Sequence, residues 1–127
     1  MNKAILMGRL TKSPELKSTQ SGIYFCNFTV AINRRFKNKD GEYDADFINC
    51  VSWRNTSEFI TKYFGKGDMI AAVGTIQTRN YENDKGDRVY ITEVLVDEVY
   101  FCGGKQSKND TDQQYMPPTD EDLPFDL

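Results

Sequence analysis

The stretch that decides the fold runs from position 24 to position 32 and reads Tyr24-Phe25-Cys26-Asn27-Phe28-Thr29-Val30-Ala31-Ile32. Every even-numbered residue in it is apolar. Successive side chains of a β-strand point to opposite faces, so this period of two places the apolar residues on one face. The stretch therefore predicts a strand with one face in a hydrophobic core.

Further strands are expected on both sides of this stretch. Residues 3–10 contain a short apolar run followed by Gly8, which predicts a strand with a bend. Residues 47–53 resume the strand pattern after a polar turn. Two more strands are expected at about 68–81 and 88–101, joined by a second polar turn.

One helix interrupts the strands. Asn55 is a candidate N-cap with Glu58 three residues later, as in a capping box, and Gly65 is a candidate helix end. Between them lies an apolar stripe at helical spacing, formed by Phe59, Ile60, Tyr63 and Phe64. Five strands with a helix between the third and fourth is the order of the oligonucleotide/oligosaccharide-binding (OB) fold, so we expect an all-β Greek-key barrel.

The charge separates the chain into two parts. The 127 residues carry a net charge of −3, but residues 1–105 hold 15 basic and 13 acidic side chains, and residues 106–127 hold one basic and six acidic ones. The end of the chain is polar and acidic, with too few apolar groups to offset the entropy of ordering. We expect an OB domain over residues 1–104 and a disordered acidic tail over residues 105–127.

Composition excludes several classes of chemistry. The chain contains no histidine, which excludes Ser-His-Asp and Cys-His catalysis and the commonest zinc ligand sets. Cys26, Cys50 and Cys102 lie too far apart for a zinc knuckle, and we expect them to be small buried residues. No apolar run is long enough to span a bilayer and no signal peptide is evident. We expect a soluble, cytoplasmic protein with no metal, no cofactor and no enzymatic activity.

Four aromatic residues are candidates for stacking on nucleic-acid bases. Phe36 lies within a basic cluster, and Tyr81 lies between polar neighbours at the entrance to the second hairpin. Phe47 and Trp53 point to the same side of their strand, with Arg54 adjacent. Aromatic faces beside cations are what unpaired bases and phosphates require.

The competing interpretation is that these aromatic residues belong to the core, as most strand aromatics do. Phe47 and Trp53 escape it only if the opposite face, with Ile48 and Cys50, is the core. The other aromatic residues assigned to the core are Tyr24, Phe25, Phe28, Phe59, Tyr63 and Phe64. For Tyr24 and for Tyr100 the alternative of an exposed binding residue stays open.

Basic residues near these aromatics are candidates for phosphate contacts. Phosphate binding depends on local clusters of cations, since charges beyond about a Debye length of ~10 Å act only weakly. The candidates are Arg9, Arg34, Arg35, Lys37, Arg54, Arg79, Lys85 and Arg88.

The end of the tail has the composition of a peptide ligand. Acidic residues alternate there with apolar ones, which suits a basic, apolar pocket on another protein. A purely solubilising tail is the alternative, but it has no use for apolar residues. The candidate partner-binding residues are Asp120, Glu121, Asp122, Leu123, Pro124, Phe125 and Leu127.

Several strings together resemble one family. They are Gly8-Arg9-Leu10-Thr11-Lys12-Ser13-Pro14-Glu15-Leu16, Phe28-Thr29-Val30-Ala31-Ile32-Asn33-Arg34, Asp46-Phe47-Ile48-Asn49-Cys50-Val51-Ser52-Trp53, Lys66-Gly67-Asp68, Gly74-Thr75-Ile76-Gln77-Thr78-Arg79-Asn80-Tyr81 and Thr92-Glu93-Val94. In this order and spacing, over residues 1–102, they resemble the bacterial or phage-encoded single-stranded DNA-binding proteins.

This resemblance implies a nucleoid-associated homotetramer that coats single-stranded DNA in replication, recombination and repair. It implies stacking at the four aromatic positions chosen above. It also implies that the acidic tip docks replication and repair proteins, which read a final Phe and the terminal carboxylate. Here Asp126 and Leu127 follow Phe125, so either Leu127 takes the terminal role or partner binding is altered.

Three other functions compete with this one. An OB module for structured RNA or tRNA would carry similar basic and aromatic residues. A metal-dependent nuclease would use carboxylates such as Asp44, Asp46 and Asp97, although no base or nucleophile accompanies them. An interaction adaptor would use only its tail.

Overall fold

The computed structural model describes residues 1–103, which form one sheet that curls into a barrel, together with one helix. The elements are β1 (Ala4–Leu10), β2 (Lys17–Ser18), β3 (Tyr24–Lys37), β4 (Tyr43–Trp53), α1 (Arg54–Tyr63), β5 (Met69–Glu82) and β6 (Arg88–Phe101). The predicted tail, residues 105–127, lies outside the described residues. No helix in residues 1–103 is long and apolar enough to cross a membrane.

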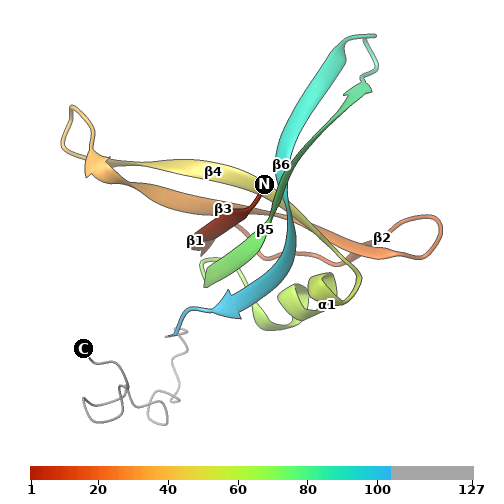
Figure 1. Ribbon diagram of the computed structural model, residues 1–127, viewed down its shortest axis with the longest axis horizontal. Helices are drawn as coiled ribbons and strands as arrows, with labels where there is room; N and C mark the ends of the chain where they lie inside the picture. The colour runs from red at the N-terminus through yellow and green to blue at the C-terminus, as the bar shows by residue number, and fades with distance from the viewer. Residues whose placement is uncertain (104–127) are drawn as a thin grey trace.

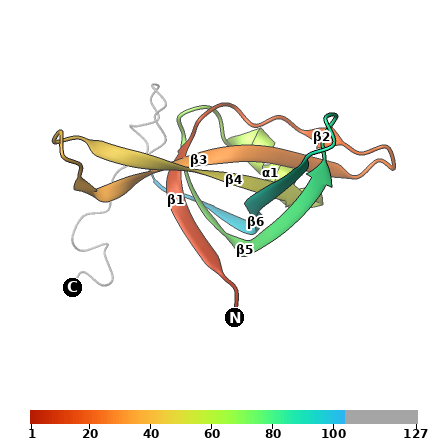
Figure 2. The ribbon, with the colours of Figure 1, turned by 90° about the horizontal axis from the view of Figure 1, so that it is seen from above.

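The barrel closes because β1 pairs with two strands. Ala4 to Arg9 pair with β5, and Arg9 and Leu10 also pair with β3. The remaining neighbours are β5–β6, β6–β4 and β4–β3, which completes a ring of five strands, and the short β2 adds to β3 (Figures 1 and 2). Gly8 lies at the crossing, where a Cβ would collide with the carbonyl oxygen of Ala31. The predicted five-stranded OB barrel is confirmed, and Gly8 permits the close approach of β1 to β3.

The core lies inside this ring. The alternation in β3 is confirmed, because Cys26, Phe28 and Val30 are buried, although Tyr24 at the start of the strand is exposed. Cys50 on β4 is buried against the same core, and Ile48 packs against it. The face of β4 opposite Phe47 and Trp53 is therefore the core face.

Helix α1 lies between β4 and β5 and covers one end of the barrel, with Ile60 and Phe64 in the core (Figure 1). The predicted start of the helix is wrong. Trp53, not Asn55, is the N-cap residue, and no side chain caps the helix. The helix begins directly after β4, because Arg54 adopts a φ of +54° and turns the chain from the strand into the helix.

The end of the helix also differs in mechanism from the prediction. The helix ends at Tyr63, and Phe64 follows in an extended conformation with its N–H donating to the carbonyl of Ile60. Gly65 lies just beyond and does not adopt a positive φ, whereas Gly67 does, at +85°.

Two hairpins project from the barrel as arms in different directions (Figures 1 and 2). We call residues 34–46, the outer parts of β3 and β4 with their turn, the β3–β4 arm. We call residues 80–90, the outer parts of β5 and β6 with their turn, the β5–β6 arm. The side-chain oxygen of Asn38 accepts hydrogen bonds from two backbone N–H groups in the first turn, and that of Asn83 does the same in the second. The predicted polar turns are thus at the tips of the two arms.

Candidate nucleic-acid interface

The β3–β4 ribbon presents two aromatic platforms on its outer face. Phe47 pairs with Ala31, and Trp53 pairs with Phe25. The side chains of Phe47 and Trp53 are 64% and 40% exposed, and the Trp53 ring lies 5.4 Å from the Phe25 ring, tilted by 37°. Phe47 and Trp53 are on the same face of β4, as the alternation predicts, although Val51 on that face is buried.

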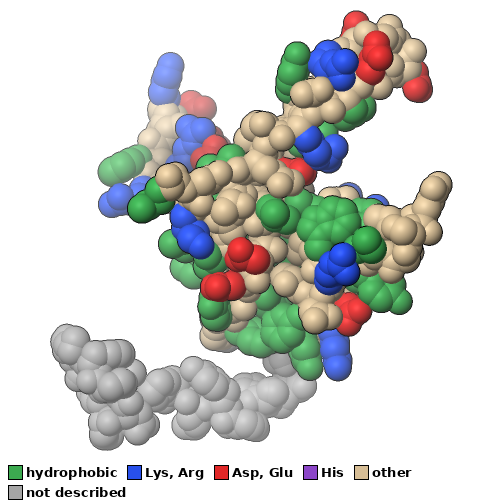
Figure 3. Space-filling view, turned by 45° about the vertical axis from the view of Figure 1, so that its right-hand side comes forward, with side chains coloured by type: hydrophobic (Ala, Val, Ile, Leu, Met, Phe, Trp, Pro, Cys, Tyr) green, Lys and Arg blue, Asp and Glu red, His purple; other side chains and the backbone are tan. Residues whose placement is uncertain are grey.

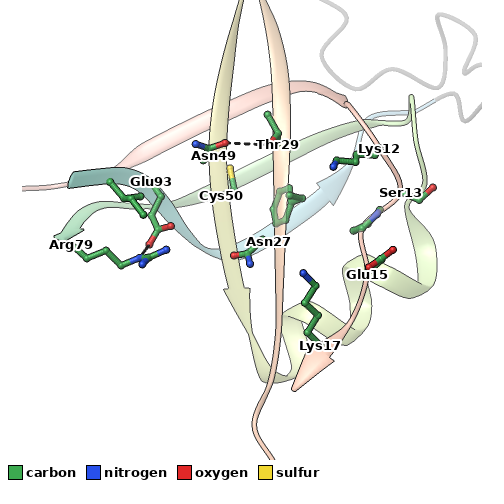
Figure 4. A pocket seen from close by; sticks show the side chains of 13 residues that line it. Lys12, Ser13, Glu15, Lys17, Asn27, Thr29, Asn49, Cys50, Arg79 and Glu93 are labelled. Atoms are coloured by element: carbon green, nitrogen blue, oxygen red, sulfur yellow. Dashed lines mark hydrogen bonds and ion pairs between the residues drawn. The ribbon is translucent and has the colours of Figure 1, made fainter. Parts of the chain in front are cut away.

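A groove of about 420 Å³ lies across the paired strands β3 and β4 (Figure 4). Its floor is formed by Asn27, Thr29 and Asn49, where the Thr29 hydroxyl donates to the Asn49 side-chain oxygen at 3.2 Å. Asn49 is at the register between Phe47 and Trp53. The groove therefore continues the surface that the two aromatic rings begin.

Cations flank the groove on both sides. Figure 4 shows Lys12 and Lys17 on one side of the paired strands and Arg79 with Glu93 on the other. Lys12 and Lys17 were not among the sequence candidates. They lie in the connection between β1 and β3, without an aromatic neighbour to single them out; their closeness to the groove follows from β2 pairing with β3 at Lys17–Phe25.

Arg79 is held by an ion pair at the edge of the groove. Its Nε donates to Oε2 of Glu93 at 3.0 Å, and the side-chain amide of Gln77 donates to the same oxygen at 3.0 Å. Glu93 is almost fully buried. Desolvation alone would raise the pKa of Glu93, but the hydrogen bonds from Arg79 and Gln77, with the charge of Arg79, lower it below its usual value.

The β3–β4 arm carries a second aromatic and cationic surface. Phe36 is 77% exposed, and the guanidinium carbon of Arg35 lies 5.6 Å from its ring centroid. The Lys37 ammonium lies 5.8 Å from the ring of Tyr43, an exposed aromatic residue that sequence reasoning missed. Arg34 instead donates from both Nε and Nη2 to Asp46, which lowers the pKa of that carboxyl.

The β5–β6 arm carries Tyr81, which is 46% exposed and pairs with Val89. Tyr90 pairs with Asn80, so it lies on the opposite face of the arm from Tyr81. It is more exposed than Tyr81 and was also missed by the sequence analysis. Tyr43 lies between Glu42 and Asp44, the same polar setting that singled out Tyr81, whereas Tyr90 lies between Val89 and Ile91 and carries no such signal. Figure 3 shows Lys and Arg side chains on both arms beside hydrophobic ones.

The structure thus brings together only part of the predicted site. Of the predicted residues, Arg79 lines the central groove, and Phe47 and Trp53 lie two and four residues from Asn49, which also lines it. Phe36 and Tyr81 lie on separate arms. Of the other predicted cations, Arg35, Lys37 and Lys85 lie on the arms. Arg9 donates to the carbonyl of Gly67 at 2.9 Å, and Arg88 donates to the side-chain oxygen of Asn80 at 3.1 Å. Arg54 borders a separate cavity with Tyr24 and Glu58. The predicted partner-binding residues 120–127 lie outside the described residues.

The carboxylates considered for a nuclease do not form a site. Asp44 accepts a hydrogen bond from Asn38 at 3.0 Å, and Asp46 is paired with Arg34. Asp97 borders a different cavity, beside Phe59 of α1. Within residues 1–103, no group of three His, Cys, Asp or Glu side chains could hold a metal ion. These three carboxylates have different partners and surroundings, so they offer the nuclease interpretation no shared metal site within residues 1–103.

Comparison with known proteins gives consistent matches. The model of the single-strand binding protein family matches residues 1–102. A protein named single-stranded DNA-binding protein 1 from Staphylococcus aureus is 50% identical over 113 residues, which cover 89% of this chain and 72% of the relative. A single-stranded DNA-binding protein from Bacillus cereus is 48% identical over 118 residues, covering 90% of this chain and 69% of the relative. One from Listeria innocua is 48% identical over 107 residues, covering 84% and 67%.

Proposed function

Because this chain belongs to the single-strand binding protein family, whose members are non-enzymatic DNA-binding proteins, we propose that it binds and protects single-stranded DNA without sequence preference. The cellular processes we assign to it are replication, recombination and repair. The relatives described above are named for single-stranded DNA binding, and none of those names supports the RNA or tRNA alternative.

The observation that carries this proposal is the pair of exposed rings, Phe47 and Trp53, on the ribbon that also contributes Asn49 to a cation-flanked groove. Single-stranded DNA offers a flat base and one phosphate per nucleotide. Stacking accepts any base because every base has a π face, so this arrangement binds without reading sequence. In single-strand binding barrels, the class to which this chain belongs, stacking contributes ~1–3 kcal/mol per base.

The two arms extend this path. Phe36 with Arg35, and Tyr81 near the tip of the other hairpin, offer a further ring on each arm. We assign stacking to Phe36, Phe47, Trp53 and Tyr81, and phosphate contacts to the basic residues around them. Lys12 and Lys17 join the phosphate-contacting set because they line the groove.

We also propose that the protein acts in the bacterial cytoplasm as a homotetramer and recruits replication and repair proteins through residues 120–127. Exposed apolar residues on β1, Ile5 and Met7, are consistent with a contact between copies. The acidic and apolar composition of residues 120–127 supports a docking role.

Trp53, the only tryptophan, makes the test direct. Its fluorescence is titrated with oligothymidine at two salt concentrations, and the same samples are run in a gel-shift assay. Saturable quenching that weakens with salt supports the proposal. Absence of both quenching and a gel shift would refute it.

A variant pair locates the binding face. Trp53→Ala should weaken binding equally on all homopolymers and leave the salt dependence unchanged, because stacking does not release counterions. Tyr100→Ala is the matched control, since Tyr100 is an exposed aromatic at the far end of β6, paired with Ala71. Folded RNA as competitor should fail to displace oligothymidine; efficient displacement would favour the RNA-binding alternative.

A further inference from the structure

The junction between β4 and α1 contains a buried pair of hydroxyl groups. Ser52 is the last residue of β4 before Trp53, and Ser57 lies in the first half of α1. Their hydroxyl oxygens are 2.7 Å apart, and both residues are completely buried. The hydrogen bond therefore ties the end of the strand to the helix from the inside.

The chain between these two serines adopts a conformation that local interactions do not stabilise. Arg54 adopts a φ of +54°, a left-handed conformation that is unfavourable for a residue with a Cβ. The helix has no side-chain cap at its N-terminus. Neither local backbone preference nor capping holds the turn, which leaves the Ser52–Ser57 bond and the packing of Ile60 to fix it.

Trp53 occupies the centre of this turn as the N-cap residue. Its side chain is 40% exposed, and within residues 1–103 the one aromatic ring in contact with it is that of Phe25. Packing on one side leaves the direction of the ring dependent on the backbone at position 53. That backbone is set by the residue immediately before it and by the helix immediately after it.

We propose that Ser52 and Ser57 are positioning residues for the Trp53 platform, so that their hydrogen bond sets the affinity for single-stranded DNA through the orientation of Trp53. This inference rests on the proposed function. It assigns a binding role to two side chains that touch no DNA and that are fully enclosed.

The variants follow from the burial of both groups. Ser57→Ala alone leaves the Ser52 hydroxyl buried without a partner, which destabilises the fold for reasons unrelated to DNA. The double variant Ser52→Ala/Ser57→Ala removes both partners together and leaves no unsatisfied group. Thr61→Val is the matched control, because the Thr61 hydroxyl donates only to carbonyls of its own helix, those of Ser57 and Glu58.

Two measurements are made on these variants after thermal unfolding has verified that each is folded. The first is the fluorescence anisotropy and iodide quenching of Trp53 without DNA. The second is the affinity for oligothymidine by gel shift, in the Trp53 background and in the Trp53→Ala background. The double serine variant should lower the anisotropy of Trp53 and weaken binding about three- to tenfold, a magnitude typical of coupled neighbours. In the Trp53→Ala background it should have no effect, and Thr61→Val should have none in either.

Each other outcome is decisive. An equal loss in both backgrounds would overturn the inference, because the serines would then act on the fold and not through Trp53. Unchanged affinity of the double serine variant, with Trp53→Ala weakened, would overturn the inference and leave the proposed function intact. If Trp53→Ala itself binds normally, the stacking role in the proposed function fails and this inference fails with it.

Discussion

The Nε atom of Arg79 lies 3.0 Å from Oε2 of Glu93, which joins a guanidinium at the edge of the groove to a carboxylate that is almost fully buried. Within residues 1–103 the terminal nitrogens of Arg79 form no hydrogen bond, and the side chain is about half exposed, so these nitrogens are available to donate elsewhere. Arg34 differs, because it uses both Nε and Nη2 on Asp46. Of the two ion-paired arginines in residues 1–103, we therefore expect Arg79 to donate to phosphate more readily than Arg34.

The charge of Glu93 offsets that of Arg79, which leads to the first prediction. Glu93→Gln keeps an oxygen that can accept from Arg79 but leaves the groove more positive by one charge. We expect tighter binding of oligothymidine at low salt and a log–log salt slope steeper by up to about 0.7, the value for one phosphate contact on a single strand. Fluorescence titration over a salt series measures both.

Asp97→Asn is the control for this prediction, since Asp97 is on the same strand but borders a cavity beside the helix. It should change the slope much less. Weaker binding by Glu93→Gln would contradict the prediction and would mean that the full carboxylate is needed to hold Arg79 in place.

The same carboxylate predicts an acid dependence of stability. The pKa of Glu93 is lowered in the folded protein, despite desolvation, by Arg79 and Gln77. A group with a lowered pKa contributes stability above its unfolded pKa, about 4.3 for Glu, and loses it as the pH falls through the folded value. We expect the free energy of unfolding in urea to fall below about pH 4.3 more in the parent protein than in Glu93→Gln. Parallel pH profiles for the two proteins would refute this.

Local patterns in the sequence predict much of this fold, and tertiary contacts account for what they miss. The alternation of Cys26, Phe28 and Val30 gives the core face correctly because strand periodicity is a local property. The predicted helix start at Asn55 is wrong because the chain enters the helix through a positive φ at Arg54, beside a buried Ser52–Ser57 hydrogen bond, and no capping pattern in the sequence records either feature.

The candidate site divides in the same way. Polarity around Phe36 and alternation at Phe47 were enough to predict exposed rings. The Arg79–Glu93 pair and the approach of Lys17 to the groove join segments whose register is set by the closed barrel. Such contacts depend on strand pairing and cannot be read from either segment alone.

The cysteines give a third prediction. Burial raises the pKa of the Cys50 thiol to about 12 and that of Cys26 to about 11. The thiolate is the reactive form, so both thiols should resist iodoacetamide at pH 8 in the folded protein, whereas the partly exposed Cys102 should react. Mass spectrometry should find one modified cysteine in the native protein and three after denaturation. Native modification of Cys26 or Cys50 would contradict the structure.

The last prediction concerns Gly8, where β1 passes from β5 to β3 and closes the barrel. A Cβ at this position would meet the carbonyl oxygen of Ala31 and the side chains of Val30 and Ile32, and the backbone atom cannot give way as a flexible side chain can. Overpacking of this kind costs ~1–3 kcal/mol or more. Gly8→Ala should therefore lower the free energy of unfolding in urea by at least about 1 kcal/mol.

Gly65→Ala is the matched control for this last prediction, because a Cβ at Gly65 has its nearest neighbour at 3.7 Å, an ordinary contact, and Gly65 has no positive φ. It should leave the free energy of unfolding nearly unchanged. If both alanine variants proved equally stable, the close approach of β1 to β3 at Gly8 would be wrong, and with it the closure of the barrel that places the groove between its flanking cations.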